Sequence, residues 1–175
     1  ERESEESRAE TRTETFTPRP VVVETERFVA TFTTDGARLV SLRLKDYLDV
    51  WGEWLELMAP GSAGLGVSLN GVVLEGHEFV PDRDRLVLYG QDQGEIRFRA
   101  QMKGVGLEKR LRFQGNRYRI EFDLVGSATR AAGKVGVTWD GGLADTEGAA
   151  GENAAYARIV TRVGEEVESW DTGDL

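Results

Sequence analysis

A single histidine limits the catalytic chemistry open to this chain of 175 residues. His77 lies between Glu75 and Glu78, in a stretch whose glycine indicates a turn. A Ser-His-Asp triad needs a nucleophilic serine beside the histidine, and the Gly-x-Ser-x-Gly motif is absent from the sequence. A zinc site would depend on carboxylates or water, because the chain has no cysteine. We therefore expect a solvated surface histidine and a non-catalytic protein, with no cofactor and no metal site.

Two groups of aspartates are candidate ligands for a hard cation such as Ca²⁺. They are Asp82 with Asp84, and Asp140 with Asp145. Neither group follows the Asp-x-Asp-x-Asp-Gly loop with a distant glutamate that typical calcium-binding loops use. Turn formation explains them more simply, because aspartate side chains hydrogen-bond to the backbone of turns.

Trp51 and Trp54 are the residues with the clearest potential for binding a partner. Two neighbouring indoles can line a groove for a sugar ring or an extended peptide. The segment around them, residues 46–58, places apolar side chains three and four apart, which predicts a helical turn or an irregular crossover. The plainer interpretation is that both indoles pack this crossover onto the core. Trp139 and Trp170 are likewise expected in the core or at its rim.

Lysine and arginine recur over residues 103–119. The cations of this stretch are Lys103, Lys109, Arg110, Arg112, Arg117 and Arg119. Because side chains alternate along paired strands, we expect them to point outward as a basic band. Acidic neighbours, among them Glu108, Glu121 and Asp123, favour a solvated sheet face on which opposite charges balance.

The composition excludes several classes of partner. The net charge of −9 disfavours nucleic acid, whose phosphates it would repel, and it also disfavours docking on anionic lipid. No window of the sequence reaches the about 20 apolar residues that a membrane-spanning helix needs. We expect any membrane anchor to lie outside this chain.

Alternation of apolar and polar residues predicts strands along most of the chain. Residues 21–48 read as two strands joined at Asp35-Gly36, and Asn70-Gly71 marks a second hairpin. Further pairs are expected around residues 91–94 and 114–116, and further strands at residues 135–139, 156–163 and 165–170. These short, regularly spaced strands predict an all-β fold, an antiparallel twisted β-sandwich.

The expected core follows from the same alternation. Its members are Phe28, Phe32, Leu42, Phe98, Phe113, Ile120 and Phe122, and Tyr118 is expected to face the core beside them. Residues 1–20 differ from the rest, because they are charged and carry Phe16 as their one aromatic residue. We expect a flexible charged tether over residues 1–20 and the sandwich domain over residues 21–175.

The start of the expected sandwich resembles the periplasmic domain of YidC-type membrane protein insertases. The resemblance rests on the segment Val23-Glu24-Thr25, the strand from Phe28 to Phe32, the glycine turn at Gly36, the pair Ser41-Leu42, and Leu44 with Tyr47. It is close over residues 21–48 and compositional beyond them.

This resemblance implies a large twisted sandwich, a β-supersandwich similar to the fold of galactose mutarotase. It also implies a non-catalytic domain on the periplasmic side of the bacterial inner membrane, anchored through segments outside this chain. The implied role is to help an insertase insert and fold inner-membrane proteins, as a chaperone-like module. The implied partners are Sec translocon accessory proteins and nascent membrane proteins.

A carbohydrate-binding or aldose-epimerase-like sandwich is the alternative. The shared fold type and the pair Trp51 and Trp54 favour it. The lack of a second histidine argues against the enzyme form, because the related sugar enzymes rely on histidine and glutamate around the sugar.

Overall fold

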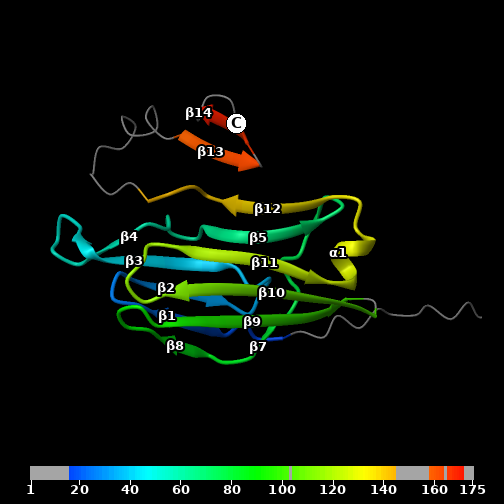
Figure 1. Cartoon of the computed structure of the whole chain (residues 1–175), viewed down its shortest axis with the longest axis horizontal. Coiled ribbons are helices and arrows are strands. Elements are labelled where there is room, and N and C mark those ends of the chain that lie inside the picture. The colour runs from blue at the N-terminus through cyan, green and yellow to red at the C-terminus, as the bar shows by residue number, and fades with distance from the viewer. Residues whose placement is uncertain (1–15, 103, 145–157, 164, 172–175) are drawn as a thin grey trace, which may run out of the picture.

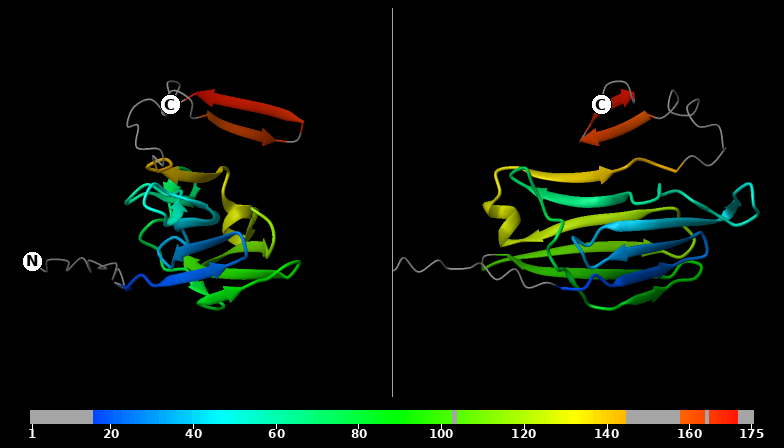
Figure 2. Two further views of the ribbon diagram at one scale, coloured as in Figure 1. Left: turned by 90° about the vertical axis from the view of Figure 1, so that its left-hand side faces the viewer. Right: turned by 180° about the vertical axis from the view of Figure 1, so that it is seen from behind.

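The computed structural model describes residues 16–102, 104–144, 158–163 and 165–171. The regular structure of this part of the chain is nearly all strand, and the exception is one five-residue helix, α1 (Ser127–Ala131). Two sheets face each other as the layers of a sandwich (Figures 1 and 2). The all-β sandwich expected from the alternation pattern is confirmed.

The larger sheet has eight strands in the order β12-β5-β3-β2-β1-β8, with β4 paired to β3 and β6 paired to β5. Its first members along the chain are β1 (Pro20–Glu24), β2 (Phe28–Thr33), β3 (Leu39–Leu48) and β4 (Trp54–Glu56). The others are β5 (Ala63–Leu69), β6 (Val72–Val73), β8 (Arg85–Val87) and β12 (Val135–Asp140).

The smaller sheet has four strands in the order β11-β10-β9-β7. They are β7 (Val80–Pro81), β9 (Gln93–Met102), β10 (Val105–Gln114) and β11 (Ile120–Gly126). A separate two-stranded sheet joins β13 (Arg158–Val163) to β14 (Glu166–Asp171). Within the described residues, no helix has the length and apolar character that crossing a bilayer requires.

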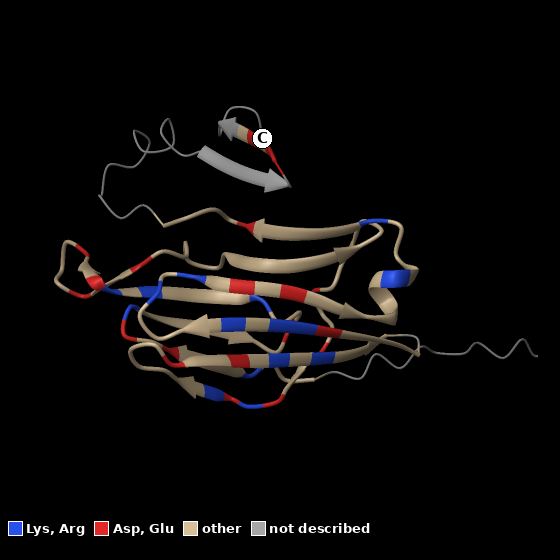
Figure 3. Cartoon of the chain, viewed as in Figure 1, with Lys and Arg blue, Asp and Glu red and all other residues tan. Residues whose placement is uncertain are grey.

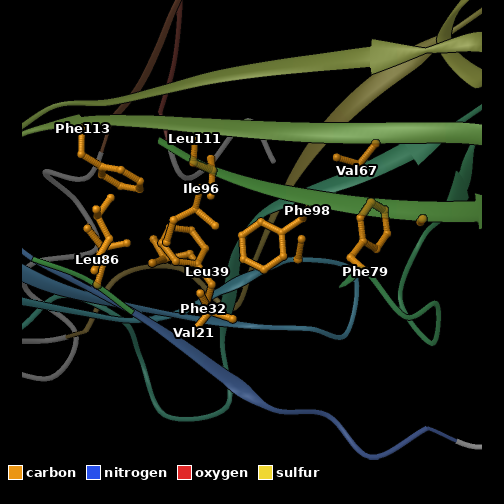
Figure 4. Close-up of a cluster of buried hydrophobic side chains, with 14 of the residues drawn as sticks. Val21, Phe32, Leu39, Val67, Phe79, Leu86, Ile96, Phe98, Leu111 and Phe113 are labelled. Carbon is orange, nitrogen blue, oxygen red and sulfur yellow. The ribbon is translucent and has the colours of Figure 1, made fainter. Parts of the chain in front are cut away.

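The core lies between the two sheets (Figure 4). The ring of Phe32 in β2 packs against Phe98 in β9 and Phe113 in β10, with centroids 6.1 and 6.2 Å away. Burying each such side chain stabilises the fold by about 1.5–3 kcal/mol. Phe28, Phe32, Phe98 and Phe113 are buried, as predicted.

Three other members of the expected core are only half-buried. Leu42, Ile120 and Phe122 pack against the buried cluster without being enclosed by it. Ile120 and Phe122 belong to β11, the edge strand of the smaller sheet, so no further strand of that sheet covers them. Tyr118 was expected to face the core and does not, because it lies before β11 begins and is exposed.

Most expected strand pairs are confirmed, with two exceptions. Residues 21–48 were predicted as two strands and form three, β1, β2 and β3, because the chain turns between Glu24 and Phe28. Asn70 and Gly71 both have positive φ in the β5–β6 turn, as a tight hairpin requires. β10 pairs with both β9 and β11. β8, however, does not form the expected hairpin with β9. It pairs in parallel with β1, so the larger sheet is mixed rather than purely antiparallel.

Lys109 was expected on the outward basic band, and this prediction is wrong. It shares a face of β10 with Leu107, Leu111 and Phe113, and its side chain is fully buried. Strand alternation places it inside, because odd-numbered residues of β10 face the core. Lys103 lies outside the described residues.

The predicted tether lies almost entirely outside the described part of the chain, which starts at Phe16. β1 begins at Pro20, one residue before the boundary expected at Val21. The division into a tether and a domain stays a prediction.

Candidate interaction surface

The hairpin formed by β3 and β4 carries Val50 and Trp51 at its tip. Their side chains are 70% and 84% exposed. Residues with polar side chains, glycine and proline dominate the corners of turns in water, because they satisfy the backbone or fit its dihedral angles. Valine and tryptophan at the corners of an exposed turn are therefore unusual, and we treat this tip as the candidate interaction surface.

Asp49 holds this tip in shape. One of its carboxylate oxygens accepts the backbone N–H groups of Trp51 and Glu53, each at 2.9 Å. The backbone N–H of Gly52 donates to the carbonyl of Asp49 at 3.1 Å, and Gly52 has a φ of 84°. Glycine suits this position because other residues rarely adopt positive φ. The two apolar corners are thus presented by an ordered turn.

The helical turn predicted for residues 46–58 is wrong. Strand β3 continues to Leu48, and the chain returns along β4. The pairing of β3 with β4 is irregular between Leu44 and Leu48, and the turn interrupts the alternation. Apolar residues consequently recur three and four apart without a helix. The expectation that both tryptophans pack into the core is also wrong.

Trp54 differs from Trp51 in its surroundings. It is 42% exposed, and the charged groups of Arg43 and Lys45 lie over its ring, 5.9 and 5.3 Å from the centroid. Lys45 is itself held by Glu24 at 2.9 Å. Such cation–π contacts fix the ring of Trp54 against the strand. Trp51 has no comparable contact among the described residues.

A polar cluster supports the base of the hairpin. The Asp46 carboxylate accepts hydrogen bonds from the Tyr118 hydroxyl and from Arg27, the latter at 2.8 Å. These two bonds, that of Tyr118 first, lower the pKa of Asp46, and the bond to Asp46 raises the pKa of Tyr118 to about 12. The Tyr47 ring lies 6.3 Å from that of Tyr118. Tyr118, predicted in the core, is instead a prop of this hairpin.

The outer face of the smaller sheet is a network of ion pairs (Figure 3). Arg112 pairs with Glu121 at 3.2 Å and with Asp123 at 2.5 Å. Arg99 and Arg110 both bind Glu108, and the bond from Arg110 comes first among the causes that lower the pKa of Glu108. The expected balance of charges on this face is confirmed, and exposed pairs of this kind contribute little stability.

Two of the hollows in the described part of the chain lie away from the hairpin. One, of about 850 Å³, is polar and lies at the end of the smaller sheet, lined in part by Arg112, Arg117 and Glu95. The other, of about 1090 Å³, is apolar and is lined in part by Val72 and Met102. Neither of them is lined by Trp51 or Trp54.

Three of the residues considered for catalysis or metal binding, His77, Asp82 and Asp84, have structural partners. His77 is exposed, and its ring lies 3.3 Å from the carbonyl of Glu75. Asp82 accepts the backbone N–H of Arg97, and Asp84 pairs with Arg19 at 3.2 Å. Asp145 lies outside the described residues, within which no cluster of metal-binding side chains occurs.

Comparison with known proteins places this hairpin inside a recognised domain. Residues 20–160 match the family model of the YidC periplasmic domain. The chain belongs to the YidC periplasmic domain family. The resemblance seen over residues 21–48 therefore extends over most of the sandwich, starting at the first residue of β1.

Two curated relatives are insertases. The chain is 33% identical over 131 residues to a membrane protein insertase YidC of Oleidesulfovibrio alaskensis, covering 70% of this chain and 23% of that protein. It is 28% identical over 139 residues to a membrane protein insertase YidC of Chlorobium limicola, covering 73% of this chain and 24% of that protein. The chain thus spans about a quarter of the length of these YidC relatives.

Within this YidC periplasmic domain, sequence reasoning found Trp51 and Trp54 but missed Val50. The signal for Val50 was an apolar residue beside a tryptophan that directly precedes a glycine, in a segment without lysine or arginine. It also missed Asp49 as the residue that shapes the turn, although Asp followed by glycine three positions later is typical of a type I turn.

Proposed function

We propose that this chain is the non-catalytic periplasmic domain of a membrane protein insertase, on the periplasmic side of the bacterial inner membrane. It helps to insert and fold inner-membrane proteins by contacting Sec translocon accessory proteins or nascent chains. Membership of the YidC periplasmic domain family and the names of its relatives support this role. The membrane anchor and the insertion machinery belong to segments outside this chain.

The contact site in this proposal is the β3–β4 hairpin, with Trp51 as the anchor and Trp54 as its support. The observation that carries it is the exposure of Val50 and Trp51 on an ordered turn. Tryptophan is among the residues most enriched at interface positions that dominate binding energy. A pre-shaped turn also reduces the entropy lost on binding.

The negative charge of residues 46–58, at the tip end of the hairpin, favours one kind of partner. Residues 46–58 contain Asp46, Asp49, Glu53 and Glu56 but no lysine or arginine. An anionic bilayer surface repels such a segment. A protein pocket with an apolar floor and a rim of lysine or arginine matches both the apolar corners and the acidic flanks.

The position of the hairpin also favours a protein. The chain enters the sandwich at Pro20, which pairs with Thr33, at the opposite end of β3 from the tip (Figures 1 and 2). A ten-residue strand spans about 33 Å. If the preceding segment leads to the membrane anchor, the tip is directed away from that attachment point.

The test uses the full-length protein in vesicles with the purified Sec translocon of the same bacterium. The double variant Val50→Ser, Trp51→Ser should lower affinity at least about tenfold, the loss expected when an apolar anchor is removed. Tyr89→Ser, which alters another exposed aromatic residue, is the matched control and should change nothing. Glu53→Lys should weaken binding through repulsion at the basic rim.

The outcomes separate the two parts of the proposal. If the wild-type protein and the double variant bind the translocon equally well, the hairpin is not the contact site, but the proposed role of the domain still stands. Failure of the wild-type protein to bind the translocon or crosslink to a nascent chain would remove the proposed partners. Vesicle binding without translocon that depends on Trp51 would replace the protein partner by lipid.

The carbohydrate alternative is not favoured by any geometry described above. The two indoles do not form one platform, because Arg43 and Lys45 lie over Trp54 while Trp51 occupies the turn. His77, which a sugar enzyme would use, is exposed in a loop.

A further inference from the structure

Lys109 reaches from the smaller sheet to the larger one. Its ammonium group donates to the backbone carbonyls of Ala37, at 2.6 Å, and Leu65, at 2.5 Å. Ala37 follows the Gly36 turn between β2 and β3, and Leu65 lies in β5. One side chain of β10 therefore bridges two separate points of the opposite layer.

Both acceptor residues have unusual backbone. Ala37 and Leu65 have φ values of 50° and 55°, in the left-handed region that non-glycine residues rarely adopt. β5 pairs irregularly with β12 at this point, between Thr138 and Asp140. A buried carbonyl without a donor costs about 1–3 kcal/mol, and Lys109 supplies a donor to both carbonyls.

Besides the two carbonyls, the ammonium group of Lys109 also lies near the face of an aromatic ring. Lys109 Nζ lies 5.2 Å from the centroid of Phe122 in β11. A neutral lysine has two N–H donors, which suffice for the two carbonyls. The additional proton of the charged form has only the face of Phe122 as a partner within the described residues.

No acid balances the charge of Lys109 in the described part of the chain, where every ion pair involves other residues. The nearest charged influence is Arg38, which has the same sign and is itself bound to Asp35 and Glu75. The cross-strand partners of Lys109 are the apolar Phe98 in β9 and Leu124 in β11, and from β5 it meets the backbone carbonyl of Leu65. Burial, followed by the charge of Arg38, lowers the pKa of Lys109 to about 7.

We propose that Lys109 is a proton-sensitive latch between the two sheets. Neutral, it ties the β10–β11 edge to Ala37 and Leu65. When it binds a proton, the buried charge favours opening of this edge, because water then hydrates the ammonium group. Half-buried Ile120, Phe122 and Leu124 of β11 are the side chains that such opening would expose.

The sign of the pH effect follows from the two states. In the unfolded or opened state the lysine keeps its ordinary pKa of 10.5, whereas in the closed state it is about 7. Between these values the open state binds more protons, so the free energy of unfolding rises with pH across this window. Below pH 7 the lysine is charged in both states, and the closed state carries the full cost of the buried charge.

The first test is an NMR titration of the lysine side-chain Cε signals in the wild-type domain, which needs no substitution. One lysine, assigned as Lys109 by its loss in Lys109→Met, should titrate near pH 7. Titration of that signal above about pH 9.5, near the ordinary value, would overturn the latch.

The second test locates the opening by amide hydrogen exchange, corrected for intrinsic rates, at pH 7 and pH 9. Protection of the β10–β11 ladder should fall by about tenfold or more on going from pH 9 to pH 7, while the β1–β2 ladder changes less. Lys134→Met, which alters an exposed lysine, should preserve this pattern and Lys109→Met should abolish it. Equal change in both ladders, or the same profile in Lys109→Met, would overturn the proposal.

If Lys109→Met does not fold, Lys109→Arg provides the same comparison. Arginine keeps a charge and donors but does not titrate in this range. The difference in protection between pH 9 and pH 7 should then disappear, and its persistence would contradict the latch.

Discussion

Lys109 and the tip formed by Val50 and Trp51 both depart from the usual burial of their residue types, but in opposite ways. Lysine is among the residues least often buried, and tryptophan is highly buried on average, yet here the lysine is enclosed and the tryptophan is 84% exposed. The lysine is compensated inside the chain by two carbonyls and an aromatic face. The tip has an ordered backbone, but its apolar side chains are largely exposed.

This difference distinguishes two kinds of residue whose burial is unusual for their type. A misplaced residue whose needs are met by its own chain serves the fold, and its removal should be felt as lost stability. A misplaced residue whose backbone is ordered but whose side chain is exposed serves a partner in the function proposed for this domain, and its removal should then lower binding. Substitutions at Lys109, in the hairpin tip and at its supports separate these two behaviours.

Lys109→Ala should cost about 2–4 kcal/mol of unfolding free energy at pH 9, because two buried carbonyls lose their donor and a cavity remains. The loss should be smaller at pH 6, where the wild-type protein itself carries a buried charge. Urea denaturation at the two pH values measures both. An unchanged stability at pH 9 would show that the bridge to Ala37 and Leu65 contributes nothing.

Asp49→Ala should cost about 0.5–1.5 kcal/mol locally, since the N–H groups of Trp51 and Glu53 lose their common acceptor. The effect should appear as faster amide exchange at these two residues, with little change in the core strands. Asp49→Asn keeps an acceptor oxygen and is the control. Equal exchange in all three proteins would mean that the turn is held by other interactions.

Trp54→Ala should lower stability by about 0.5–1 kcal/mol through loss of its contacts with Arg43 and Lys45. Trp51→Ala should change stability by less than about 0.5 kcal/mol, as exposed substitutions usually do. Thermal or urea denaturation compares them directly. A larger loss for Trp51 than for Trp54 would reverse the assignment of anchor and support.

Tyr118→Phe should raise the pKa of Asp46 toward its ordinary value, because the hydroxyl bond is the first cause of the lowered pKa. A carboxylate with a lowered pKa stabilises the fold above its unfolded pKa, and this contribution is lost as the pH falls through the folded value. As the pH falls, the variant should therefore lose this stabilising contribution of Asp46 at a higher pH than the wild-type protein does. NMR titration of Asp46 checks this, and an identical titration curve would remove Tyr118 from the network.

Several features could be predicted from the sequence because they depend on local pattern. Alternation in residues 28–32 and 95–102 identified the strands and their buried faces, and Asn70-Gly71 identified its turn, since side-chain direction in a strand has a period of two. The same pattern contained the burial of Lys109, which has the parity of Leu107 and Leu111. The charge of Lys109 led to the wrong prediction, because we gave the usual cost of burying a lysine more weight than the position of Lys109 in the strand.

Tertiary structure alone decided which local patterns prevailed. Spacings of three and four in residues 46–58 fit a helix equally well, and only pairing with β3 made this segment a hairpin. The parallel pairing of β8 with β1 joins segments about sixty residues apart, which short-range signals do not encode. The burial of Lys109 became possible because carbonyls of Ala37 and Leu65, distant in sequence, converge on one point across the core. Local sequence determined which way side chains point, whereas the packing of the two sheets determined what they meet there.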